Sequence, residues 1–300
     1  MSKISVIGAG NLGAAIANEI ASRGIADELV LVDILRELAE GQALDIQHSL
    51  PYKNWTKVSS GDYDKIGNSH IVVVTAGKPR TAEMSDRLQL AEINLKIVKG
   101  ILEQIKKYAP DTIIVTITNP MDIMNHFIHE SGFHREKVIG SGGQLDSARL
   151  QLALGHPEKE VHAYVLGEHG HDQVPVFSKV RINGAAMEYA GAEKIAIWEK
   201  IKQASMQVIQ KKGHTAFAPA AHTADMVQSI LKDERKLLMC SANLKGEYGL
   251  NDVSLGVPAI LGMNGIEEIE EWKLAEEELR QLREAGRKLK EFYQSAIKNI

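Results

Sequence analysis

Four short polar motifs in this 300-residue chain hold the side chains best suited to chemistry. They are Thr75-Ala76-Gly77, Thr118-Asn119-Pro120, Gly140-Ser141-Gly142 and Gly167-Glu168-His169-Gly170. Each follows an apolar run that predicts a buried strand, or begins at its end. Open α/β sheets build their sites where strands end, so we expect these motifs to contribute to one site.

Within these motifs, His169 is the natural proton donor, because the pKa of a histidine ordinarily lies near neutrality. Asp146 and Arg149 follow the third motif three residues apart, so they share one face of a predicted helix. Asp146 would orient the imidazole and stabilise its charged form. Arg149 can grip a carboxylate with two parallel hydrogen bonds, and Arg87 would stabilise negative charge developing on a substrate oxygen. Asn119 can hydrogen-bond the same oxygen or the cofactor.

Each of these residues also has a plainer interpretation. A histidine in a glycine-rich loop is more often a surface residue than a catalyst. Asp146 and Arg149 could form an ion pair on a helix surface, and Arg87 could simply be a charged surface residue at the start of its helix. His126 and His129 are three apart on a predicted helix, but no third ligand is in register, so we predict no metal site.

A glycine-rich turn near the N-terminus predicts a dinucleotide site. It is formed by Gly8, Ala9, Gly10, Asn11, Leu12 and Gly13. The first glycine allows a tight turn, the second lets the backbone approach a pyrophosphate, and the third lets helix and strand pack closely. Asp33 ends the next apolar strand about twenty residues on, where its carboxylate can accept from ribose hydroxyls. It favours NAD over NADP, since a 2′-phosphate would meet a like charge. Arg36, one helical turn away, weakens that preference.

The first half of the chain alternates strand-like and helical patterns, which predicts a doubly wound, Rossmann-type parallel sheet. We expect strands at 4–7, 29–32, 71–75, 113–117 and 137–139, and helices at 11–23, 35–48, 88–108 and 121–131. The second half predicts an α+β arrangement with an antiparallel or mixed sheet. There we expect strands at 161–166, 174–180 and 236–242, and helices at 192–212, 219–232 and 276–296. We therefore divide the chain into a cofactor-binding domain at 1–142 and a substrate-binding, catalytic α+β domain at 143–300.

Composition excludes several classes of partner. Charged residues make up 25% of the chain, the net charge is −4, and no basic block stands out, so we expect neither nucleic acid nor a membrane surface as partner. Cys240 is the only cysteine, which rules out an intramolecular disulfide and a cysteine-rich metal site. The N-terminus runs directly into a strand and no apolar run is long enough to span a bilayer, so we expect a cytoplasmic protein.

Taken in order, the motifs resemble the lactate/malate dehydrogenase family over nearly the whole chain. The matching segments are IGAGNLG, VTAG, RLQLAEIN, TNP, GSGGQLDSAR, GEHG, GEYG and GVPAILGMNG, and APAA leans toward the malate branch. The resemblance implies an NAD-dependent dehydrogenase of 2-hydroxy acids, with malate and oxaloacetate as the expected pair and a homodimer or homotetramer as the assembly. It also implies that Asn94, Ile117, Thr118 and Asn119 line the cofactor.

The expected choice of a dicarboxylate substrate rests on Arg80. This arginine stands three residues after Gly77, where the family places its specificity residue, and an arginine there resembles the malate enzymes. The second carboxylate of oxaloacetate needs a second cation, because a buried charge without a partner is costly. The chain departs from the family at three places. His171 replaces a usual aspartate, Thr215 resembles lactate enzymes, and the segment 78–87 holds one additional residue.

Other functions remain open at this point. The nearest alternative is an L-lactate dehydrogenase or another 2-hydroxy acid dehydrogenase. An NAD-dependent glycosidase can share the nucleotide-binding fold, but such enzymes resemble longer chains with a metal-binding Cys/His pair, and Cys240 has no nearby histidine. A non-catalytic NAD-binding protein would leave the set of His169, Asp146, Arg87 and Arg149 unexplained.

Overall fold

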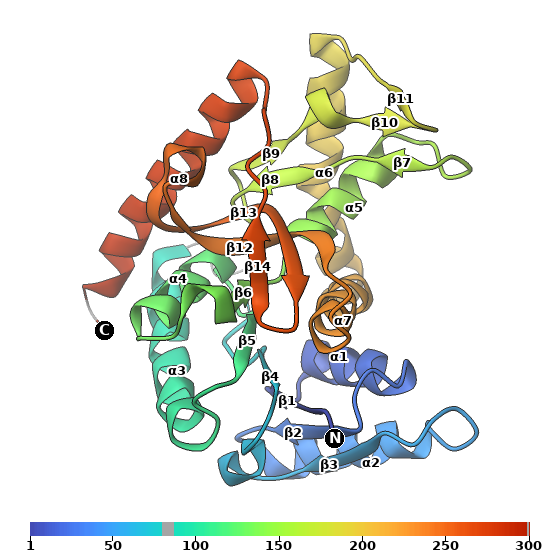
Figure 1. Cartoon of the computed structure of the whole chain (residues 1–300), viewed down its shortest axis with the longest axis vertical. Coiled ribbons are helices and arrows are strands. Elements are labelled where there is room, and N and C mark those ends of the chain that lie inside the picture. Colours follow the sequence, from blue (N-terminus) through green and yellow to red (C-terminus); the bar gives the residue numbers. More distant parts are fainter. Residues whose placement is uncertain (80–86, 299) are drawn as a thin grey trace.

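The computed structural model describes residues 1–79, 87–298 and 300. The segment 80–86 lies outside the described residues, and it includes Arg80, on which the substrate prediction depends. In the described part, one mixed sheet of eleven strands runs through both halves of the chain and helices cover it (Figure 1). The predicted α/β class is confirmed.

The first half builds the parallel part of this sheet, in the order β3-β2-β1-β4-β5-β6. Its strands are β1 (Lys3–Ile7), β2 (Glu28–Val32), β3 (Lys57–Ser60), β4 (Ile71–Val74), β5 (Ile113–Thr116) and β6 (Val138–Gly140). All four residues of β4 are buried, because helices cover both faces of a parallel sheet. The sequence missed β3, whose polar residues Ser59 and Ser60 suit its place at the sheet edge.

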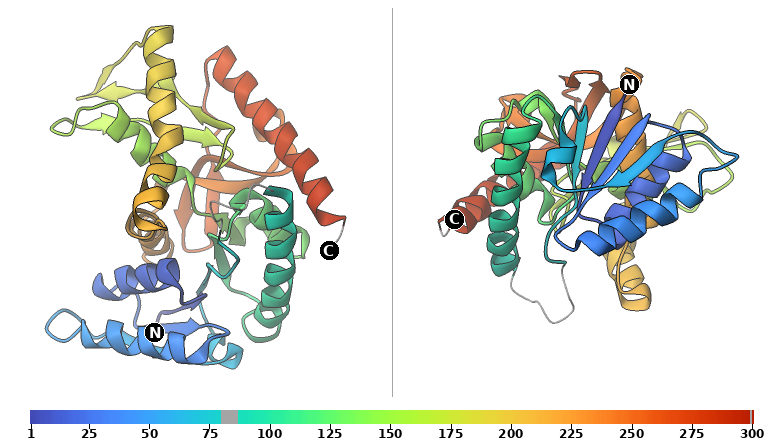
Figure 2. Two further views of the ribbon diagram at one scale, coloured as in Figure 1. Left: turned by 180° about the vertical axis from the view of Figure 1, so that it is seen from behind. Right: turned by 90° about the horizontal axis from the view of Figure 1, so that it is seen from below.

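Helices join these strands and cover both faces of the sheet. They are α1 (Asn11–Ser22), α2 (Arg36–His48), α3 (Arg87–Tyr108) and α4 (Met121–Glu130). In Figure 2, α1 and α2 lie on one face of the sheet while α3 and α4 lie on the other. This arrangement brings the carboxyl ends of the parallel strands, with the polar motifs that follow them, to one edge.

The second half extends the sheet with antiparallel strands. They are β12 (Lys236–Lys245), β13 (Asn251–Gly262), β14 (Gly265–Ile269), β8 (Val165–Gly167) and β9 (Gln173–Pro175). A second sheet contains β7 (Val161–His162), β10 (Arg181–Ile182) and β11 (Ala185–Ala186). The helices are α5 (Gly143–Ala153), α6 (Gly191–Lys212), α7 (Phe217–Leu231) and α8 (Glu276–Ile297), and short 3-10 turns form at Tyr63–Ile66, Arg135–Lys137, Phe177–Lys179 and Glu247–Gly249.

Two strand predictions in this half are wrong in detail. The run 161–166 is not one strand, because β7 and β8 belong to different sheets. The run 174–180 leaves the sheet after Pro175 and turns into a 3-10 helix. Phe177 and Val180 are nevertheless buried, since they pack with Ile197 and Ile201 of α6 in a small second core. Their apolar character reflects this core and not strand pairing.

The two halves are tied together by helices. Helix α7 packs on α1, where Arg23, the residue after α1, lies 2.8 Å from both Asp225 and Gln228 of α7. Helix α8 is amphipathic, as predicted. It packs against α3, α4 and β13, and its Leu282 and Leu289 are buried. Each such leucine stabilises the fold by about 1.5–3 kcal/mol. Within the described ranges, no helix is both long and apolar enough to cross a membrane.

Candidate active site

The glycine-rich turn at the end of β1 has the geometry of a phosphate cradle. Gly8 has a φ of +104°, and a Cβ there would lie 2.6 Å from the Ala76 nitrogen. A Cβ at Gly13 would overlap the Gly8 carbonyl oxygen, so α1 can approach β1 only with glycine at this place. A Cβ at Gly10 would meet nothing within 4 Å, so the backbone at the start of α1 is open to a ligand. Open amides at a helix N-terminus fit a pyrophosphate.

Asp33 at the end of β2 lies beside this cradle. Its Oδ2 accepts the Ala9 N–H at 2.7 Å and its Oδ1 accepts the Leu35 N–H at 2.9 Å. Each carboxylate oxygen has a second lone pair that can accept from a ribose hydroxyl. Arg36 points its Nη2 to within 2.8 Å of Asp62 Oδ2, so its charge is balanced by a carboxylate. The cradle and Asp33 therefore fit a dinucleotide with a free 2′-hydroxyl.

The residues expected to line the nicotinamide side hold two loops together. Asn94 is fully buried, and its amide accepts the Lys78 N–H at 2.7 Å and donates to the Asn119 carbonyl at 2.6 Å. The Thr118 hydroxyl donates to the Ala76 carbonyl at 2.8 Å. Ile117 is buried and the Asn119 side chain is exposed at the carboxyl edge of the sheet. A direct contact of these residues with the cofactor stays a prediction.

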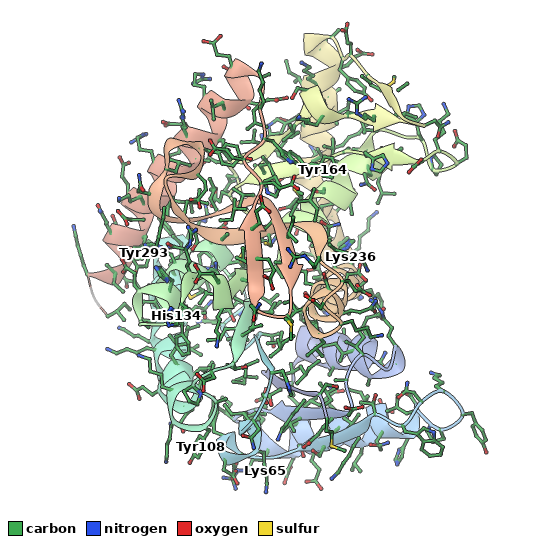
Figure 3. The ribbon with its side chains drawn as sticks, in the orientation of Figure 1. Lys65, Tyr108, His134, Tyr164, Lys236 and Tyr293 are labelled. Carbon is green, nitrogen blue, oxygen red and sulfur yellow. The ribbon has the colours of Figure 1, made fainter. Side chains whose placement is uncertain are left out.

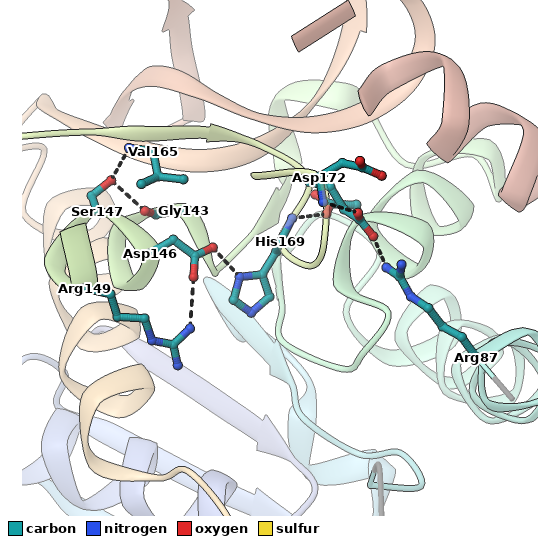
Figure 4. A network of polar contacts seen from close by, with 10 residues as sticks. Arg87, Gly143, Asp146, Ser147, Arg149, Val165, His169 and Asp172 are labelled. Atoms are coloured by element: carbon teal, nitrogen blue, oxygen red, sulfur yellow. Dashed lines mark hydrogen bonds and ion pairs between the residues drawn. The ribbon is translucent and has the colours of Figure 1, made fainter. Parts of the chain in front are cut away.

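His169, Asp146 and Arg149 meet at this edge, as Figure 4 shows. His169 Nδ1 lies 2.6 Å from Asp146 Oδ2, and Arg149 Nη1 donates to Asp146 Oδ1 at 3.0 Å. The Asp146 side chain is 2% exposed and the His169 side chain 19%. The carboxylate thus holds the imidazole with one oxygen and the guanidinium with the other, and leaves Nε2 of His169 as the ring nitrogen open to a substrate.

Local structure explains how His169 reaches Asp146. A Cβ at Gly142 would lie 2.6 Å from Cγ of His169, so the glycine before α5 makes room for the ring. Gly167 takes a φ of +88° at the end of β8, which turns the chain into the loop that carries His169. Ser147 of α5 accepts the Val165 N–H at 3.0 Å and fixes the helix to that strand (Figure 4).

The environment of His169 favours its charged form. Burial of the ring lowers the pKa of His169, but the charge and hydrogen bond of Asp146, with a smaller contribution from Asp122, outweigh it. The net pKa of His169 is raised above its ordinary value, although the nearby Arg149 opposes the shift. The imidazole is therefore held ready to donate a proton near neutral pH.

The sequence interpretation missed two carboxylates that flank His169. Asp122, in the first turn of α4, is 3% exposed and its Oδ2 accepts the His169 N–H at 2.7 Å. Burial raises the pKa of Asp122. Glu168 is 4% exposed and contacts the Arg87 guanidinium, while its Oε2 accepts the Asp172 N–H at 3.0 Å. Asp122 stands two residues after the TNP motif and Glu168 lies within the GEHG motif, and these positions were the available signal.

His126 and His129 do not meet each other but bind separate partners. His126 Nδ1 lies 2.8 Å from the Asn243 amide, and its ring packs nearly perpendicular to that of Tyr293, with the ring centroids 4.6 Å apart. Figure 3 labels Tyr293 on α8, next to α4. His129 Nδ1 lies 2.9 Å from the Phe133 carbonyl. Among the described residues, no group of three His, Cys, Asp or Glu side chains is placed to hold a metal ion.

This fold and site define an oxidoreductase that works with a nicotinamide dinucleotide. More narrowly, the chain belongs to the lactate/malate dehydrogenase family. Residues 2–140 match the family's NAD-binding domain, and residues 143–299 match its α/β C-terminal domain.

Individual relatives cover almost the full length. The chain is 44% identical to a malate dehydrogenase of Natronomonas pharaonis, over 98% of this chain and 99% of the relative. It is 38% identical to an L-lactate dehydrogenase of Acetivibrio thermocellus, over 96% and 95% of the two chains. A solved structure of malate dehydrogenase from Archaeoglobus fulgidus in complex with NADH superimposes with a TM-score of 0.91 at 35% identity, covering 98% of this chain and 99% of that one.

Proposed function

We propose that this protein is an NAD-dependent malate dehydrogenase that interconverts (S)-malate and oxaloacetate. The observation that carries the proposal is the buried Asp146 carboxylate that binds both His169 and Arg149, beside a dinucleotide cradle. Relatives named malate dehydrogenase at up to 44% identity support the dicarboxylate over a monocarboxylate. We further propose cytoplasmic location, a homo-oligomer, and a division of labour between residues 1–142 for cofactor and 143–300 for substrate.

Acid-base chemistry is the work of His169. When bound, NAD supplies or accepts the hydride. In the direction of reduction, Nε2 of His169 donates its proton to the carbonyl oxygen of oxaloacetate while the carbonyl carbon receives the hydride. The product is malate, and the ring is left neutral. Asp146 fixes the tautomer through Nδ1 and stabilises the charged ring, so the same atoms run the oxidation in reverse.

Arginines bind and polarise the substrate in this scheme. Nη1 of Arg149 is bound to Asp146, which leaves another edge of the guanidinium for the substrate carboxylate. Arg87, at the start of α3, stabilises charge on the carbonyl oxygen. Asn119 is exposed at the same edge and can donate to that oxygen. Arg80 remains the candidate for the second carboxylate on sequence grounds.

Initial rates with oxaloacetate and pyruvate, each with NADH and NADPH, test the proposal. We expect kcat/KM for oxaloacetate to exceed that for pyruvate by several orders of magnitude, and NADH to be preferred over NADPH. A wild-type enzyme that favours pyruvate would instead be an L-lactate dehydrogenase, as the relative at 38% identity is named. The family match gives no support to the NAD-dependent glycosidase that the sequence left open.

A further inference from the structure

A buried carboxylate next to the proton donor contacts the arginine of α3. Glu168 precedes His169 in the chain and its side chain is 4% exposed, so its charge needs a partner. The Arg87 guanidinium is that partner, through Nη2 and Oε1. Figure 4 shows Arg87 reaching the His169 loop from the side opposite to Asp146.

The loop around Glu168 is shaped for this contact. Glu168 Oε2 accepts the Asp172 N–H at 3.0 Å, and the Gly170 N–H donates to the Glu168 carbonyl at 2.8 Å. A Cβ at Gly170 would lie 2.6 Å from Glu168 Oε1 and 3.0 Å from Arg87 Nη2. Gly170 has no positive φ, so glycine is required here by the space that the carboxylate and guanidinium occupy.

Helix α8 contacts both Arg87 and the loop that holds Glu168. The Phe292 ring lies 5.4 Å from the Arg87 guanidinium carbon, a distance at which a cation is attracted to the ring face. Lys288, one turn earlier on α8, lies 2.7 Å from Asp172 Oδ1 and so fixes the end of the loop that Glu168 binds. The guanidinium is thus held by a carboxylate and an aromatic ring that belong to two separate elements.

We propose that Glu168 is a positioning residue that holds the Arg87 guanidinium against the loop that carries His169, from where it can stabilise charge on the substrate oxygen. This inference rests on the proposed function. A guanidinium on a long, flexible side chain loses rotamer freedom when it acts, and a fixed carboxylate removes that loss before substrate binds. A donor aimed at developing charge contributes only if it is held in place, so the effect belongs to kcat more than to substrate affinity.

The first experiment is a double-mutant cycle in kcat. Glu168→Gln keeps an acceptor for the Asp172 N–H but removes the charge, and we expect kcat for oxaloacetate to fall about tenfold with KM for NADH unchanged. Arg87→Gln should lower kcat on the order of 10²-fold. In the double variant, kcat should lie within about twofold of Arg87→Gln alone, because the carboxylate acts through that arginine. Glu278→Gln, which removes another buried carboxylate, bound to Ser178, is the matched control and should leave kcat unchanged.

The second measurement does not depend on turnover. Phenylglyoxal modifies accessible guanidinium groups, and peptide mass spectrometry reports the rate at Arg87 in the ligand-free protein. We expect that rate to rise several-fold in Glu168→Gln and in Gly170→Ala, and not in Glu278→Gln. An unchanged rate overturns the inference. It is also overturned if the fold-losses in kcat of Glu168→Gln and Arg87→Gln multiply in the double variant, because the two residues would then act independently. Wild-type protein that reduces no 2-keto acid contradicts the proposed function instead, and the labelling still reports on the contact.

Discussion

Replacing Asp146 by asparagine tests how the site controls its proton donor. The substitution keeps the shape of the side chain and removes the charge that lies 2.6 Å from His169 Nδ1. Asparagine can also present an N–H to the ring, which favours the wrong tautomer. We expect NADH binding to be retained while reduction of oxaloacetate is lost.

The expected magnitude follows from the geometry. With charge centres roughly 4 Å apart and an effective dielectric of about 20, the attraction between His169 and Asp146 is about 4 kcal/mol. Burial of the ring opposes it, and without Asp146 burial lowers the pKa of His169 with less to oppose it. The imidazolium then becomes scarce near neutral pH. The loss of imidazolium and the wrong tautomer should together lower kcat/KM for reduction about 10²- to 10⁴-fold.

The pH profile separates this account from a general loss of structure. The pKa of His169 in the folded protein is raised above its ordinary value of 6.5. In the wild type, kcat/KM for reduction should therefore stay constant through pH 6.5 and fall only as the pH passes the raised pKa. The stability that this shift contributes is likewise present below the ordinary value and lost as pH rises through the folded one. In Asp146→Asn the alkaline limb of kcat/KM should move to lower pH. Glu160→Gln, which breaks an exposed pair with His162 at 3.0 Å, is the control. A limb that stays in place in Asp146→Asn would refute the reasoning.

Four further substitutions extend the test. Asp33→Ser should weaken the binding of NADH and reduce the ratio of kcat/KM with NADH to that with NADPH, because the charge that repels a 2′-phosphate is gone. An unchanged ratio would show that Asp33 does not discriminate between the two cofactors. Gly142→Ala places a methyl group 2.6 Å from His169 Cγ and should lower kcat at least tenfold, which stopped-flow rates would show. Leu289→Ala, at a buried position of α8, should lower the free energy of unfolding in urea by about 2–5 kcal/mol. Arg80→Gln should lower kcat/KM for oxaloacetate and raise it for pyruvate; the same ratio of the two would remove Arg80 from substrate choice.

The sequence predicted the parallel half of the fold well, because its signals are local. A glycine-rich turn between a strand and a helix needs only neighbouring residues, and Gly8 and Gly13 play their predicted steric roles. Strand β13, by contrast, was not predicted from the sequence. Gly256 and Pro258 interrupt its apolar pattern, and both residues are unfavourable inside a strand. The structure gives Gly256 a reason, since a Cβ there would lie 2.7 Å from the Gly167 carbonyl oxygen, on the strand that leads to His169.

The candidate site divides in the same way. His169 and Asp146 were predicted because each belongs to a recognisable motif. The contacts of Asp122 and Glu168 were not, since their partners lie 47 and 81 residues away along the chain. The sequence does not show which residue a carboxylate will contact, so only the folded chain reveals that these two flank His169.

The central claim is that His169 is the acid-base group of an NAD-linked reduction, and His169→Asn tests it most directly. Two quantities are measured on the same preparation: NADH affinity by fluorescence titration, and turnover of oxaloacetate with NADH. The account predicts wild-type affinity for NADH and a loss of turnover on the order of 10²- to 10⁴-fold. Turnover within tenfold of the wild type, with NADH bound, would contradict it.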